Sequence, residues 1–210
     1  MAKVIKKVMS EKSLVSPKGY ALWVKVGKRV DEYEGKKKLV VNMYFDDATE
    51  AKMKKLCDKF LSDAKKSEEF KGKNWRPSND RCGYEIRNVK VDGEEQEKAL
   101  FKFWTGATVT DPDTGDVRKK VVPIYSVERK KKINPYEVEI GNGSEIRVAF
   151  RPEAYWTSRD SNGVSLYLNK MVVDKLVEYN GDSSFDEFGI KMDEDENEGF
   201  DSVEDEDIPF

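Results

Sequence analysis

Residues 99–105 read ALFKFWT, and this stretch decides the fold. Successive side chains of a β-strand point to opposite faces of the sheet. Phe101 and Phe103 therefore share one face, while Lys102 and Trp104 share the other. The first face is typical of a strand that packs into a core. The second face, with a tryptophan beside a lysine, is unusual for a core. We predict a strand over residues 99–109 whose two faces have different roles.

The same alternation occurs in two other stretches, residues 20–26 (YALWVKV) and residues 146–151 (IRVAFR). We expect each to contain a strand with an apolar core face. The predicted core faces consist of Tyr20, Leu22, Val24 and Val26 in the first stretch, and of Ile146, Val148 and Phe150 in the second. The predicted outer faces carry Trp23 with Lys25 and Arg147 with Arg151. One pattern repeated in three strands favours a common role for these outer faces.

The remaining pattern predicts one long helix among several short strands. Further strands are expected at residues 38–45, 83–91, 121–127 and 164–168, separated by turn signals. Residues 49–66 carry a single apolar stripe at helical spacing, and Asp47 with Glu50 three residues later resembles a capping box. Residues 171–179 also have apolar side chains at helical spacing and predict a short closing helix.

This order of elements predicts a mainly β, α+β fold. We expect an OB-fold-like closed β-barrel with one long amphipathic helix and a short C-terminal helix. A different barrel of about five to seven strands also fits, because periodicity does not separate the two. Residues 1–17, which include four lysines, are expected to form a mobile basic arm or a loose first strand.

Charge is distributed very unevenly along the 210 residues. Residues 182–210 contain 13 acidic residues and one basic residue, for a net charge of −12. Residues 1–181 contain 37 basic and 28 acidic residues, for a net charge of +9. A basic body joined to an acidic tail indicates a polyanionic partner for the body and a separate role for the tail. We predict a binding domain at residues 1–181 and a tail at 182–210, disordered because its few apolar residues cannot offset chain entropy.

The chain contains no histidine and only two cysteines, Cys57 and Cys82. The absence of histidine excludes Ser-His-Asp and Cys-His nucleophilic machinery and imidazole bases. Two isolated cysteines do not make a zinc site. We therefore expect no cofactor, no metal and no enzymatic activity. No apolar run has the length of a signal peptide or a membrane span, so we expect a cytoplasmic protein that does not enter a membrane.

The paired aromatic and basic residues indicate a partner with apolar ring faces and a charged backbone. Aromatic side chains stack on unpaired bases, and lysine or arginine neutralises phosphates, with little regard to base identity. Residues 118–132 add seven basic residues against one acid. We predict sequence-tolerant binding of single-stranded DNA. The candidate contact residues are Trp23, Lys25, Tyr44, Trp75, Arg76, Arg81, Lys102, Trp104, Lys119, Lys120, Arg129, Lys130, Lys131, Arg147 and Arg151. The alternative is structural: the tryptophans would cover a second core, with lysine stems passing beside them.

The chain ends in Asp205, Glu206, Asp207, Ile208, Pro209 and Phe210. A terminal phenylalanine offers an aromatic ring and an α-carboxylate that together fit an apolar pocket with a basic rim. The preceding proline lowers the entropy lost on docking. We predict that these six residues bind partner proteins. The tail could instead lie in the basic groove of its own body, or serve solubility alone.

The ending of residues 207–210 (DIPF) after an acidic run resembles the tip of bacterial single-stranded DNA-binding proteins. Residues 143–150 (GSEIRVAF), 163–169 (GVSLYLN) and 172–176 (VVDKL) are similar to the C-terminal core of the tailed-phage single-stranded DNA-binding proteins. The resemblance implies an OB-fold that coats single strands and destabilises duplexes, and a tail that contacts replication and recombination proteins. It also implies a bacterial host cytoplasm and allows a homodimer formed through the tail. Residues 68–97 have no counterpart in that family.

Two other functions are compatible with these features. Asp111, Asp113 and Asp116 could hold a hard cation for a metal-dependent nuclease, although Asp-Pro-Asp-Thr-Gly-Asp is more typical of a hairpin turn. A strand-annealing recombination protein or an RNA-binding chaperone would share the features of the body.

Overall fold

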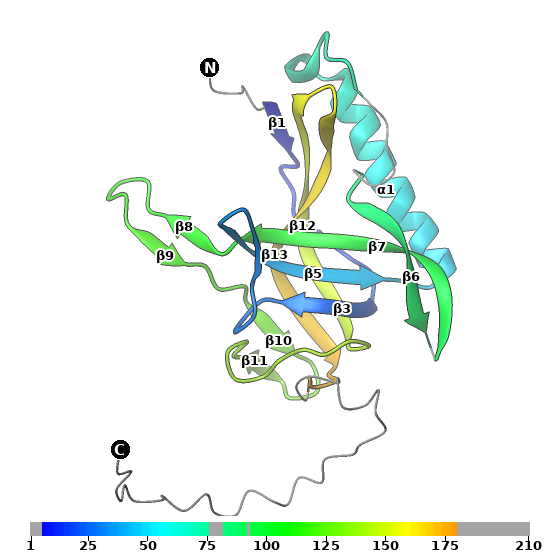
Figure 1. Ribbon diagram of the computed structural model, residues 1–210, viewed down its shortest axis with the longest axis vertical. Helices are drawn as coiled ribbons and strands as arrows, with labels where there is room; N and C mark the ends of the chain where they lie inside the picture. The colour runs from blue at the N-terminus through cyan, green and yellow to red at the C-terminus, as the bar shows by residue number, and fades with distance from the viewer. Residues whose placement is uncertain (1–5, 76–81, 92, 180–210) are drawn as a thin grey trace, which may run out of the picture. The chain divides into compact units, whose positions relative to one another are not determined.

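The computed structural model describes residues 6–75, 82–91 and 93–179 (Figure 1). It contains one long helix, α1 (Asp47–Lys66), followed by a single 3-10 turn, η1 (Glu68–Phe70). The strands are β1 (Lys6–Met9), β2 (Leu14–Val15), β3 (Gly19–Lys25), β4 (Asp31–Tyr33), β5 (Lys36–Tyr44), β6 (Tyr84–Val91), β7 (Glu94–Gly106), β8 (Thr108–Thr110), β9 (Val117–Lys119), β10 (Ile124–Ser126), β11 (Lys131–Ile133), β12 (Glu145–Ser158) and β13 (Ser161–Lys175). The predicted tail lies outside the described residues, so the domain boundary at residue 181 stays a prediction.

Five strands are paired in a circuit that returns to its starting strand. β3 pairs with β5, β5 with β7, β7 with β13, β13 with β12, and β12 with β3. The β7–β13 pairing is parallel and the other four are antiparallel. Two of the pairings, β3–β12 and β7–β13, are short seams with two pairs of facing residues each. The described part of the chain has the mainly β, α+β, OB-like fold that the sequence predicts.

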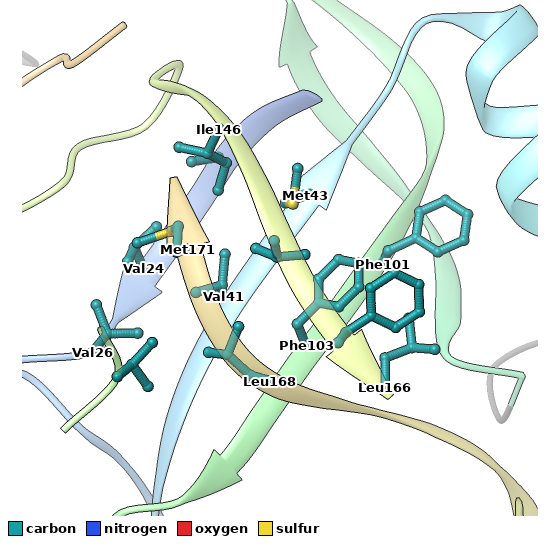
Figure 2. Packing of buried hydrophobic residues seen from close by; sticks show 14 of the residues in the cluster. Val24, Val26, Val41, Met43, Phe101, Phe103, Ile146, Leu166, Leu168 and Met171 are labelled. Atoms are coloured by element: carbon teal, nitrogen blue, oxygen red, sulfur yellow. The ribbon is translucent and has the colours of Figure 1, made fainter. Parts of the chain in front are cut away.

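The core lies between the strands of this circuit (Figure 2). Phe101 and Phe103 of β7 are fully buried, as the alternation of residues 99–105 predicts. The ring of Phe103 packs edge-on against Phe150 of β12, with 5.1 Å between the ring centroids. Leu166 and Leu168 of β13 complete this part of the core in Figure 2. The opposite faces of β5 and β7 do not enter this core.

Helix α1 forms from the apolar stripe, but its N-cap is not the predicted one. Asp46 rather than Asp47 caps the helix, because its carboxylate accepts hydrogen bonds from the Thr49 backbone N–H at 2.9 Å and the Thr49 hydroxyl at 2.7 Å. Glu50 does not reach back to the cap. It accepts a hydrogen bond from the Ala99 backbone N–H at 3.0 Å and thereby ties the helix to β7.

The predicted closing helix at residues 171–179 is wrong. Residues up to Lys175 continue β13, which pairs with β12 along most of its length. Met171 and Val173 are fully buried while Val172 is not, which is the period of two of a strand. Apolar side chains in this segment fit both periods, and pairing with β12 decides between them.

The N-terminal segment is a strand rather than an arm from Lys6 onward. β1 pairs with the C-terminal half of β12, with Lys6 facing Trp156 and Met9 facing Glu153. The strand predicted at residues 121–127 is shorter and covers only β10. The Asp-Pro-Asp-Thr-Gly-Asp segment forms the turn between β8 and β9, where the Asp111 carboxylate accepts hydrogen bonds from two backbone N–H groups at 3.0 and 3.2 Å.

Cys57 and Cys82 are both buried, as expected. Burial raises the pKa of the Cys57 thiol to about 12. Within the described ranges, no helix combines the length and the apolar character that crossing a bilayer requires.

Candidate nucleic-acid interface

The outer face of β3, β5 and β7 gathers the aromatic and basic residues that the alternation predicts. Lys25 of β3 faces Val40 of β5, and Val40 faces Trp104 of β7 on its other side. In the next row, Asn42 of β5 faces Lys102 of β7. The lysines and the tryptophan from distant parts of the sequence therefore lie on one surface, because the three strands are adjacent and in this register.

A β-bulge in β3 turns Trp23 outward. The pairing of β3 with β5 shifts between Leu22 and Lys25, and Trp23 has a φ of 47°. Its backbone N–H donates a hydrogen bond to Asn142 Oδ1 at 2.8 Å, which supports this unusual conformation. The indole is 48% exposed.

The bulge also corrects the predicted core face of residues 20–26. Val24 and Val26 are buried in the main core, as expected. Before the bulge, however, Ala21 faces that core, and Tyr20 and Leu22 lie on the outer face. The extra residue of the bulge exchanges the two faces, which strict alternation does not anticipate.

Three adjacent hollows cross this outer face. The first, about 550 Å³, is lined by Trp104, Lys38, Lys102 and Arg87 among others. The second, about 400 Å³, shares Lys102 and Arg87 with the first and adds Trp23, Lys25 and Arg29. The third, about 640 Å³, shares Trp23 with the second and extends past Tyr20. We call this surface the outer groove and define it by Tyr20, Trp23, Lys25, Lys38, Arg87, Lys102 and Trp104.

The outer groove is rich in positive charge. The Lys38 Nζ lies 4.3 Å from the centroid of the Trp104 ring, in a cation–π contact. Burial, followed by the charge of Lys102, lowers the pKa of the Lys38 ammonium. Three carboxylates also line the hollows. Asp31 contacts Lys25 and Lys102, and Glu85 pairs with Arg87 at 2.8 Å. Glu153, in the first hollow, pairs with Lys7 at 2.8 Å.

A small second core lies at one end of the outer face. It consists of Leu22, Tyr44, Val89 and Leu100, with Val91 packed against them. Tyr44, a predicted contact residue, is buried there, and its ring stacks on Tyr20 with 5.2 Å between the centroids. Tyr20, which is 40% exposed, is the tyrosine that this surface presents.

Four other predicted contact residues make interactions within the protein. Arg147 forms a two-point ion pair with Asp174 across β12 and β13, at 2.8 Å and 2.5 Å. Arg151 donates a hydrogen bond to the Ser10 carbonyl. Lys120 donates hydrogen bonds to the hydroxyls of Thr105 and Tyr167. The ring of Trp75 packs edge-on against Phe70. Hydrogen bonds from Lys120 and Thr105 outweigh burial and lower the pKa of the Tyr167 hydroxyl.

Four further predicted cations line none of the three hollows. Lys119 is exposed on β9, Lys130 and Lys131 are exposed in the β10–β11 hairpin, and Arg129 pairs with Glu178. Arg76 and Arg81, and the tail residues 205–210, lie outside the described residues. The structure thus brings together Trp23, Lys25, Lys102 and Trp104 of the predicted set.

Sequence reasoning missed three residues of the outer groove: Tyr20, Lys38 and Arg87. Lys38 stands two positions before Val40, so it shares the outer face of β5 and could have been assigned from alternation. The outward position of Tyr20 could not be assigned from alternation, because the bulge exchanges the two faces of β3. Arg87 of β6 lines two of the hollows, and the sequence carries no signal that places it there.

The fold belongs to a class found in solved structures of bacteriophage proteins that bind single-stranded DNA. The structure of gp2.5, a single-stranded DNA binding protein encoded by bacteriophage T7, is similar with a TM-score of 0.61 and 19% identity, over 92% of this chain and 100% of that one. The single-stranded DNA-binding protein of bacteriophage Enc34, in complex with ssDNA, is similar with a TM-score of 0.55 and 15% identity, over 86% of this chain and 97% of that one. A C-terminal truncation of the Enc34 protein has a TM-score of 0.52 at 15% identity, over 82% of this chain and 97% of that one. No protein-family model matches the sequence, and a search of the curated proteins found no match.

Proposed function

We propose that this protein binds single-stranded DNA along the outer groove and coats it without strong sequence preference. The observation that carries the proposal is the row of three aromatic side chains, Trp104, Trp23 and Tyr20, interleaved with the ammonium groups of Lys38, Lys102 and Lys25 on one open surface. No catalytic step is needed for this function, and we propose that the protein is not an enzyme.

The chemistry of the groove suits an unpaired strand. Stacking of a base on an aromatic side chain contributes about 1–3 kcal/mol per base and tolerates any base, because every base has a π-face. Lysines neutralise the phosphates and release counterions, so the affinity should fall with salt. In a duplex the bases are already stacked on each other, so no exposed base face is available to stack on Trp104 or Trp23.

The fold supports the same proposal. A circuit of strand pairings that returns to its first strand supports the closed barrel that we propose. A protein of similar fold, that of bacteriophage Enc34, has been solved in complex with ssDNA. The resemblance of residues 207–210 and of the strands at residues 143–150 and 163–169 points in the same direction.

We further propose that residues 205–210 recruit replication or recombination proteins in a bacterial host cytoplasm. The acidic run and the terminal phenylalanine support this role by their chemistry alone. A homodimer formed through the tail belongs to the same proposal.

The test is a titration of the full chain with fluorescently labelled oligo-dT, matched duplex and oligo-U. Strong binding of oligo-dT, weak binding of the duplex, and a steep loss of affinity with salt are expected. Lys102→Gln should weaken binding, whereas Lys131→Gln, an exposed lysine away from the outer groove, should not. Equal binding of oligo-dT and duplex would contradict the proposal, and a preference for oligo-U would assign the groove to RNA.

A further inference from the structure

Asp31 lies in the outer groove where a phosphate is expected. Its Oδ1 accepts a hydrogen bond from the Lys25 Nζ at 2.7 Å, and its Oδ2 lies 3.6 Å from the Lys102 Nζ. These three side chains line the middle hollow together with Trp23. A carboxylate held by two ammonium groups beside an exposed indole has the charge and the neighbours that a nucleotide phosphate would have next to its stacked base.

The position of Asp31 is set by a hairpin rather than by the core. β4 pairs only with the start of β5, where Asp31 faces Lys38 and Tyr33 faces Lys36. The turn is formed by Glu34 and Gly35, both with positive φ (50° and 72°), as in a two-residue hairpin turn. Since β4 is three residues long and half-buried or exposed, the hairpin can move without disturbing the buried strands.

Asp31 is a bound anion at neutral pH. The hydrogen bond from Lys25, and then the charge of Lys102, lower the pKa of the Asp31 carboxyl despite partial burial. All three side chains keep contact with solvent, with exposed fractions of 39% for Lys25, 48% for Lys102 and 29% for Asp31. A competing anion from solution can therefore reach the two ammonium groups.

We propose that Asp31 is an internal competitor of the DNA phosphate, which holds Lys25 and Lys102 in the free protein and releases them when a single strand binds. This inference rests on the proposed function of the outer groove. Replacement of the Asp31 carboxylate by a phosphate on Lys25 and Lys102 changes the free energy little. A polyanion without unpaired bases therefore gains little binding free energy at this site. An unpaired strand also gains stacking on Trp23, and Asp31 thereby makes binding depend on the bases.

The neighbouring acid Glu32 is a matched control. It stands on the same strand, pairs with Lys37 at 3.6 Å, and lines none of the three hollows. Asp31→Asn and Glu32→Gln change the net charge equally and leave the side-chain size unchanged. A difference between them therefore reports the position of Asp31 rather than overall charge.

The experiment measures the affinity of the full-length wild type, Asp31→Asn and Glu32→Gln for oligo-dT over a range of NaCl concentrations. We expect Asp31→Asn to bind about twofold to fivefold more tightly at low salt, the range for partly exposed ion pairs. Its slope of log affinity against log salt should steepen by about 0.7, the increment for one further neutralised phosphate on a single strand. Glu32→Gln should change the affinity by less than about 1.5-fold.

Each other outcome overturns the inference in a distinguishable way. If the wild type binds and Asp31→Asn gains nothing, or Glu32→Gln gains as much, Asp31 does not compete with phosphate. If the wild type fails to bind oligo-dT, the proposed function fails and takes this inference with it. Asp31→Ser is the second variant, and failure of both Asp31 variants to fold, seen by circular dichroism, would assign Asp31 a purely structural role.

Discussion

The Nζ of Lys38 lies 4.3 Å from the centroid of the Trp104 indole, on the outer face of two paired strands. The contact places the Lys38 ammonium, which can pair with a phosphate, beside the Trp104 ring, on which a base can stack. It also holds the indole in a defined orientation before any ligand arrives, so little side-chain entropy remains to be lost on binding.

Trp104→Ala should weaken binding of oligo-dT about fivefold to 150-fold, because one stacked base contributes about 1–3 kcal/mol. Anisotropy of a labelled oligonucleotide measures this loss without depending on tryptophan emission. Trp156→Phe is the control, since Trp156 contacts Lys73 instead, at 4.4 Å, and does not line the outer groove. Equal losses in the two variants would remove Trp104 from the interface.

Two substitutions of Trp23 should separate its effect on DNA affinity from its effect on the free energy of unfolding. Its positive φ of 47° suits glycine better than any residue with a Cβ. Trp23→Gly should therefore be more stable to urea than Trp23→Ala by about 1–2 kcal/mol, while both lose oligo-dT affinity to a similar extent. A Trp23→Gly variant that binds like the wild type would show that the indole does not stack on DNA.

Tyr20 and Tyr44 stack on each other but should respond differently to substitution. Tyr44 is buried in the second core, so Tyr44→Ala should cost about 3–5 kcal/mol of unfolding free energy. Tyr20 is 40% exposed, so Tyr20→Ala should cost much less stability and should weaken DNA binding. Urea unfolding and anisotropy measured on both variants test this division, and a Tyr20→Ala variant with unchanged affinity would contradict it.

The cap of α1 should make stability depend on pH. Hydrogen bonds from the Thr49 side chain and backbone lower the pKa of the Asp46 carboxyl below its ordinary value of 3.8. A lowered pKa in the folded state means that the stabilisation is complete above about pH 3.8 and is lost as the pH falls through the folded value. The difference in unfolding free energy between wild type and Asp46→Ala should be constant from pH 7 to pH 5 and should shrink in more acidic urea titrations. A difference that grows on acidification would contradict this sign.

Much of the interface could be predicted from the alternation of side chains alone. Lys102, Trp104, Trp23 and Lys25 were assigned to outer faces from residues 99–105 and 20–26, and the structure places them on one surface. The position of Tyr20 could not be predicted, because one inserted residue in a bulge reverses the faces and leaves no trace in hydrophobicity. Arg147 and Arg151 share the pattern of a binding face, but their partners, Asp174 and the Ser10 carbonyl, come from distant parts of the chain.

The same limit explains the error at residues 171–179. Spacing alone allows both a helix and a strand there, and only the partner strand β12 selects the strand. The long helix could be predicted because its apolar stripe, from Met53 to Ala64, repeats over about three turns and depends on no distant partner.

The two short seams divide the circuit into two plates, one made of β3, β5 and β7 and the other of β12 and β13. Each plate is held by long antiparallel pairings, whereas two facing pairs hold each seam. Trp104 itself is one of the seam residues, since it faces Tyr167. A strand of DNA bound over Trp104 would therefore lie on one of the two shortest pairings of the circuit. Amide hydrogen exchange along this seam would report its opening in the free protein and its protection when DNA is bound.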